Sequence, residues 1–70
     1  MFGTIVRLLL AKGFGFARGE DGGVYFIHAK SVVPRTDFEK LYEGQRVEFT
    51  PSTTAQGLRA EEVRIASLEN

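Results

Sequence analysis

The sequence predicts an all-β protein, a five-stranded antiparallel β-barrel. Five short segments, at residues 4–10, 13–17, 24–28, 45–50 and 58–65, are β-branched, aromatic or alternately apolar, as strands usually are. Glycine-rich or polar stretches separate them, and no segment has the spacing of a strong amphipathic helix. At 70 residues a barrel is favoured over a two-sheet sandwich, because closure removes exposed strand edges.

The first half of the chain predicts three strands. Residues 4–10 are aliphatic around a single Arg7, residues 13–17 alternate Gly with Phe, and residues 24–28 read Val-Tyr-Phe-Ile-His. Residues 19–23, Gly-Glu-Asp-Gly-Gly, supply the positive φ angles of a tight turn. The second and third strands are therefore expected to form a hairpin.

The second half predicts a long connection and two further strands. Residues 29–43 carry turn-forming side chains and a weak helical spacing around Phe38, so we expect a loop with at most one helical turn. A strand at 45–50 precedes a polar loop at 51–56, and 58–65 is the last strand. The expected core residues are Tyr25, Ile27, Val47, Phe49, Val63 and Ile65.

Composition limits the class of protein. The chain has no Cys, which excludes disulfides and cysteine-ligated metals, and we expect no cofactor. Nine basic residues balance nine acidic ones, so any nucleic-acid binding must come from local arrangement rather than bulk charge. The aliphatic run 8–11 is far shorter than the roughly 18 residues of a membrane span. We expect a cytoplasmic, monomeric protein with one domain, residues 1–66, and a frayed tail, residues 67–70.

Two phenylalanines share one side of the predicted second strand. Because side chains alternate along a strand, Phe14 and Phe16 project to one face, while Gly13, Gly15 and Ala17 project to the other. Taken singly, each phenylalanine is as expected in a core as on a surface. Inward rings would leave bare glycine outside, so the spacing favours an outward aromatic face.

The predicted hairpin adds further rings and cations to this face. Phe26 and His28 share one side of the third strand, and antiparallel pairing can set them beside the two phenylalanines. Lys12 opens the second strand and Lys30 follows the third. Flat rings with flanking cations suit unpaired bases, which offer a π face to stack and a phosphate to neutralise.

Residues 3–65 resemble the cold-shock domain family, whose members are OB-fold, Greek-key barrels that bind single-stranded nucleic acid. Residues 12–16, Lys-Gly-Phe-Gly-Phe, match the family's first ribonucleoprotein motif, and residues 26–28, Phe-Ile-His, sit at its second. The resemblance implies single-stranded RNA or DNA as the partner. It also implies a binding face made by Lys12, Phe14, Phe16, Phe26, His28 and Phe38, with Arg7 and Arg59 at its margins.

Several positions depart from that family pattern. Leu8 stands at the position of the family's binding Trp, so one ring of the platform is lost. Because one base stack contributes roughly 1–3 kcal/mol, we expect binding to be weaker by about tenfold or more. Val24 replaces a usual Asp, and Ala29 stands where an aromatic is frequent. Arg59 occupies a usual Gln position, where we expect a phosphate contact or a guanidinium stacking surface in partial compensation.

Two functions follow as alternatives. The first is a nucleic-acid chaperone that binds unpaired strands transiently and discourages secondary structure. The alternative is a protein-interaction module on the same barrel, with weak or lost nucleic-acid binding, because Leu8 and Val24 make the face more apolar. No enzyme or small-molecule substrate is expected, since the sequence offers no phosphate loop or usable nucleophile–base pair, and the lone His28 cannot form a triad or a metal site.

Overall fold

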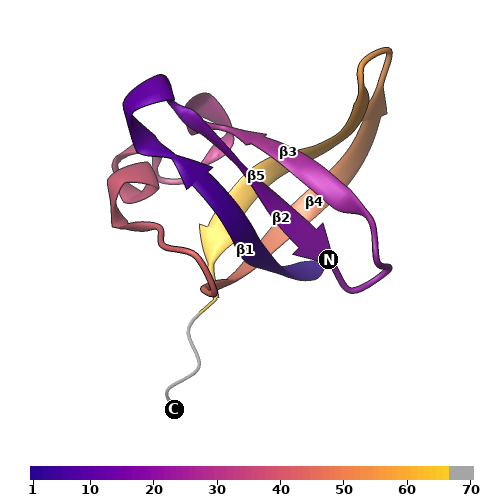
Figure 1. Ribbon diagram of the computed structural model, residues 1–70, viewed down its shortest axis with the longest axis horizontal. Helices are drawn as coiled ribbons and strands as arrows, with labels where there is room; N and C mark the ends of the chain where they lie inside the picture. Colours follow the sequence, from indigo (N-terminus) through magenta and orange to yellow (C-terminus); the bar gives the residue numbers. More distant parts are fainter. Residues whose placement is uncertain (67–70) are drawn as a thin grey trace.

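The computed structural model describes residues 1–66, and in it five strands close into a barrel (Figure 1). The predicted all-β barrel is confirmed, and the predicted tail at 67–70 lies outside the described residues. Within the described part, no helix has the length and apolar content needed to cross a membrane. The strands are β1 (Phe2–Leu9), β2 (Phe14–Gly19), β3 (Val24–His28), β4 (Arg46–Thr54) and β5 (Gly57–Ile65).

The barrel order is β1-β2-β3-β5-β4, and β4 returns to pair with β1. Four of these contacts are antiparallel. The contact between β3 and β5 is parallel and consists of one pairing, between Phe26 and Arg59. The barrel therefore closes at a point where a residue of the last strand lies beside the predicted aromatic face.

The first strand carries a β-bulge and passes close to β2. The register shifts between Ile5 and Arg7, so Val6 is an extra residue in β1. A Cβ added to Gly15 of β2 would lie 2.7 Å from the carbonyl oxygen of Arg7. Glycine is thus required there for the two strands to approach, which agrees with the expectation that the small residues of β2 face inward.

The β2–β3 hairpin is held by one carboxylate. Asp21 accepts a hydrogen bond from the backbone N–H of Gly23 at 2.9 Å and another from the Tyr25 hydroxyl at 2.6 Å. Gly22 has a φ of +87°, which glycine adopts without strain. The hydrogen bond from Tyr25 lowers the pKa of Asp21, and the bond from Gly23 lowers it further. The hydrogen bond between Tyr25 and Asp21 in turn raises the pKa of Tyr25.

Three short 3₁₀ helices occupy the connections. They are η1 (Leu10–Lys12), η2 (Ala29–Ser31) and η3 (Arg35–Lys40). The prediction of at most one helical turn in 29–43 is therefore wrong. The reason is packing, since the two helices turn the chain so that Phe38 and Leu41 reach the core.

The core is one cluster inside the barrel. Its buried members are Ile5, Ala17, Tyr25, Ile27, Val32, Phe38, Leu41, Val47, Phe49, Ala60 and Val63. Five of the six predicted core residues are among them, and Ile65 is partly buried against the cluster.

The β4–β5 hairpin is longer than predicted. Residues 51–56 were expected to form a loop, yet β4 continues to Thr54 and only two residues separate it from β5. Pro51 does not end the strand, because the hydrogen bonds from β4 to β1 and the preceding Met1 reach only as far as Phe49, and β4 is an edge beyond it. Figure 1 shows this hairpin projecting beyond the rest of the barrel.

Candidate nucleic-acid interface

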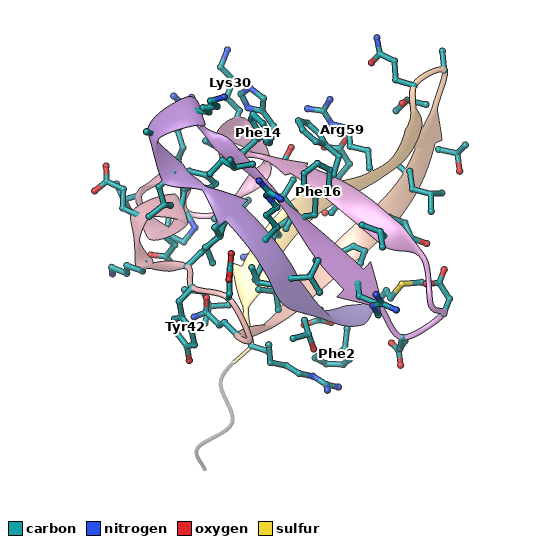
Figure 2. All side chains as sticks on the ribbon, in the orientation of Figure 1. Phe2, Phe14, Phe16, Lys30, Tyr42 and Arg59 are labelled. Atoms are coloured by element: carbon teal, nitrogen blue, oxygen red, sulfur yellow. The ribbon has the colours of Figure 1, made fainter. Side chains whose placement is uncertain are left out.

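The register of β2 and β3 gathers four rings on the outside of the barrel. Phe14 pairs with His28, and Phe16 pairs with Phe26. All four side chains are half-buried. We call these four residues the aromatic face; Figure 2 shows Phe14, Phe16 and, near them, Arg59 gathered on one side of the molecule.

The rings meet at an angle rather than in a stack. The centroid of Phe26 lies 5.5 Å from that of Phe14 and 5.7 Å from that of Phe16, with interplanar angles of 33° and 69°. Phe14 and Phe16 are 6.0 Å apart and nearly perpendicular at 86°. His28 follows at 6.4 Å from Phe26. Edge and tilted contacts of this kind stabilise a cluster of aromatic rings.

His28 adds a polar group to the aromatic face. Its Nδ1 accepts a hydrogen bond from the backbone N–H of Lys30 at 3.1 Å. In the neutral ring the proton then resides on Nε2, which gives the face a hydrogen-bond donor. The same bond begins η2, so the turn that orients the imidazole also positions Lys30.

Cations border the aromatic face on several sides. Lys12 ends η1 and Lys30 lies in η2, both exposed, and Gly13, with a φ of +79°, joins η1 to β2. Arg7 is exposed on β1 opposite Phe16. The structure therefore brings the predicted cations to the borders of the face.

Arg59 extends the face from β5. Its guanidinium carbon lies 5.7 Å from the ring centroid of Phe26. Its Nε is 3.1 Å from a carboxylate oxygen of Glu61, and the other oxygen of Glu61 accepts a hydrogen bond from the Ser31 hydroxyl at 3.2 Å. The buried Nε–H makes no hydrogen bond with the described residues. The arginine is thus held beside the rings by a carboxylate that is itself anchored.

A hollow of about 370 Å³ lies between the aromatic face and the β4–β5 hairpin. Sequence reasoning missed its hairpin side, because only the pairing of distant strands brings it to the phenylalanines. Val24 and Leu58, exposed at 45% and 38%, form apolar parts of its wall. The complete lining is Phe16, Val24, Phe26, Thr54, Gln56, Leu58 and Arg59.

Comparison with known proteins decides the family. The model of the "Cold-shock" DNA-binding domain matches residues 1–66. This chain belongs to that cold-shock domain family. Among similar proteins, the major cold shock protein CspA of Pseudomonas aeruginosa is 41% identical over 63 residues, which cover 90% of each chain. The cold shock protein CspC of Bacillus subtilis is 38% identical over 64 residues, covering 91% of this chain and 96% of that protein.

In this cold-shock domain, Phe38 does not lie on the aromatic face. The sequence-based prediction included it, but its side chain is 5% exposed and belongs to the core cluster. Burying an aromatic ring removes a large apolar area from water. The 3₁₀ turn of η3 makes this burial possible, so the structure places Phe38 in the core rather than on the aromatic face.

The cold-shock domain also presents Arg7, rather than Leu8, at the aromatic face. Leu8 pairs with Gly15 and packs partly buried against the core, whereas Arg7 pairs with Phe16. The bulge at Val6 causes this exchange, since one extra residue reverses the sides to which the following residues point. The expectation that Leu8 takes a position on the face is therefore corrected, and β1 contributes a cation.

Proposed function

We propose that this cold-shock domain binds single-stranded RNA or DNA on the aromatic face and acts as a nucleic-acid chaperone. The observation that carries the proposal is the cluster of three phenylalanine rings and one imidazole, with centroids 5.5 to 6.4 Å apart, on the outside of the barrel. Unpaired bases stack on such rings whatever their sequence. The family's description as a DNA-binding domain supports the same proposal.

The bordering cations serve the phosphates in this proposal. Lys12 and Lys30 lie at one end of the aromatic face, and Arg7 and Arg59 at its sides. Each phosphate that they neutralise contributes about −0.7 to the slope of log affinity against log salt concentration. Binding is therefore salt-dependent although the chain is formally neutral.

A backbone-amide NMR titration tests the binding proposal. The ligands are a short oligothymidine and the matching oligouridine, since the chain has no Trp to report binding by fluorescence. We expect shifts to concentrate at residues 12–17 and 24–30 and at Arg59. A titration at low salt without shifts would remove the proposal.

Phe16→Ala is the variant that tests stacking. Phe16 touches two other rings and lines the hollow. Loss of one base stack, at roughly 1–3 kcal/mol, should weaken oligonucleotide binding about 5- to 150-fold. Tyr42→Ala is the matched control, because Tyr42 is an aromatic residue exposed at 60% away from the aromatic face (Figure 2). Equal effects of the two substitutions would contradict stacking on Phe16.

Chaperone action has its own assay. A nucleic-acid hairpin with a fluorophore and a quencher at its ends should open at lower temperature when the protein is present, and Phe16→Ala should abolish this effect. If the protein binds the nucleic-acid hairpin without changing its melting temperature, it is a nucleic-acid-binding module and the chaperone proposal is contradicted.

A protein-interaction module is the second candidate. The observation in its favour is the apolar wall of the hollow, where Val24 and Leu58 are both exposed. It would be supported if Val24→Asp abolished capture of a protein partner while oligonucleotides neither bound nor competed.

A further inference from the structure

A second hollow, of about 310 Å³, lies on the outside of the barrel beyond the aromatic face. Two arginines flank it from neighbouring strands. Thr4 of β1 pairs with Arg18 of β2 on one side and with Arg46 of β4 on the other. Paired residues point to the same side of a sheet, so both arginines face outward with Thr4. Two strand spacings of roughly 4.8 Å separate their backbones by about 10 Å.

Within the part of the chain that the structure describes, no ion pair neutralises the two arginines of this second hollow. Among residues 1–66, neither Arg18 nor Arg46 forms a salt bridge with a carboxylate. Arg46 instead lies over the ring of Phe2, with its guanidinium carbon 5.5 Å from the centroid. Glu20 also lines the hollow, and its Oε1 accepts the backbone N–H of Phe2 at 2.9 Å. The hollow therefore presents two cations and one carboxylate with an oxygen already engaged.

The second hollow lies next to the aromatic face along β2. Arg18 stands two residues after Phe16 on β2 and on the same side of the strand, a distance of about 7 Å along it. Across the sheet Arg18 pairs with Val24, which lines the first hollow. In Figure 2 Phe2 marks the opposite end of the molecule from Phe14 and Lys30. A single-stranded nucleic acid that leaves the aromatic face along β2 thus reaches Arg18 before Arg46.

We propose that the second hollow binds the phosphodiester backbone of the same single strand, with one phosphate at Arg18 and one at Arg46. The planar guanidinium presents paired donors that match phosphate oxygens, so arginine suits this task better than lysine. The inference rests on the proposed function, and it extends the binding site by the nucleotides that flank those stacked on the aromatic face.

The length of the oligonucleotide distinguishes binding at the aromatic face from binding at the second hollow. We would titrate oligothymidines of about four and about ten nucleotides, within the range of OB-fold site sizes, into wild-type protein and the Arg18→Gln/Arg46→Gln double variant. The shorter strand is covered by the aromatic face and should bind both proteins equally. For the longer strand, loss of two phosphate contacts should reduce the magnitude of the salt slope by about 1.4.

Two further variants sharpen this test. Arg35→Gln/Lys40→Gln removes the same charge from η3, outside both hollows, and should leave the binding of both strands unchanged. Glu20→Gln removes the carboxylate of the second hollow while keeping an oxygen for the N–H of Phe2, so it should tighten binding of the longer strand alone. Heteronuclear NMR spectra check that each variant keeps the fold.

The outcomes distinguish this inference from the proposed function. If the double variant binds the longer strand as wild type does, or weakens both strands equally, the second hollow holds no phosphate and the inference is overturned. If wild-type protein binds neither strand at low salt, the proposed function fails as well. A reduced salt slope for the longer strand alone, absent from the η3 control, establishes the second hollow as part of the site.

Discussion

Arg59 combines a planar surface and a positive charge in one side chain. Its guanidinium lies over the ring of Phe26. The Nε of Arg59 forms an ion pair with Glu61, and the hydroxyl of Ser31 donates a hydrogen bond to the same carboxylate. A planar cation fixed in this way offers a surface on which a base can stack and donors for a phosphate. In the proposed function both the charge and the shape of this side chain contribute, and substitutions can separate the two.

We expect Arg59→Lys and Arg59→Gln to differ in their salt dependence. Arg59→Lys keeps the charge but loses the plane, so affinity should fall about 2- to 5-fold, the equivalent of an exposed cation–π contact, with the salt slope unchanged. Arg59→Gln should in addition reduce the magnitude of the slope by about 0.7. Titrations at several salt concentrations measure both effects. Wild-type affinity in Arg59→Lys would show that only the charge matters.

Among the elements, the β2–β3 hairpin carries the aromatic face, and one hydrogen bond ties its turn to the core. Tyr25 is a core residue whose hydroxyl donates to Asp21 in the turn. Its ring also lies 5.0 Å from that of Phe49 in β4. The register that pairs Phe16 with Phe26 thus depends on a turn that the hydrogen bonds of the Asp21 carboxylate stabilise.

The stability of this hairpin should depend on pH in both directions. The lowered pKa of Asp21 means that its contribution is present above the ordinary aspartate pKa and is lost as pH falls through the lowered value. The raised pKa of Tyr25 means that its contribution is present below the ordinary tyrosine pKa and is lost as pH rises through the raised value. Tyr25→Phe should lower stability at neutral pH and flatten both dependences.

Urea unfolding at a series of pH values measures this prediction. Tyr42→Phe is the control, since Tyr42 is exposed and its hydroxyl has no hydrogen bond within the described residues. A pH profile of Tyr25→Phe that parallels wild type at both ends would contradict the role of the Asp21–Tyr25 bond.

For the whole molecule, the distribution of charge and the closed core matter more than composition. The chain is formally neutral, yet arginines and lysines border the aromatic face and the second hollow. Glu48 and Glu62 line a separate hollow with Arg64. A small barrel has little stability in excess, so these surfaces exist only while one core cluster remains intact.

Phe38 is the residue that tests this dependence on the core. Removing a buried ring commonly costs about 3–5 kcal/mol, so Phe38→Ala should leave much of the protein unfolded at room temperature. Phe38→Leu should fold and bind an oligonucleotide as wild type does, because Phe38 lies in the core and not on the aromatic face. Calorimetry and NMR titration measure the two effects. If Phe38→Leu is folded but binds the oligonucleotide more weakly than wild type, Phe38 would be part of the binding interface after all.

The barrel, the β2–β3 hairpin and the outward position of four rings could be predicted from the amino-acid sequence alone; the rings are those of Phe14, Phe16, Phe26 and His28. These features follow from alternation and turn chemistry, which act between near neighbours in the chain. Their expected places agree with the structure because the pairing of two strands across a tight turn leaves one register.

Which other residues lie beside the aromatic face could be seen only in the folded structure. The bulge at Val6 turned Arg7 outward and Leu8 inward, and no local pattern marks an extra residue in a strand. The burial of Phe38 and the approach of Leu58 to Val24 both join segments distant in sequence. Such contacts form only when the barrel closes. Whether a side chain is then exposed or buried depends on which strand or helix packs against it, and not on its neighbours in the sequence.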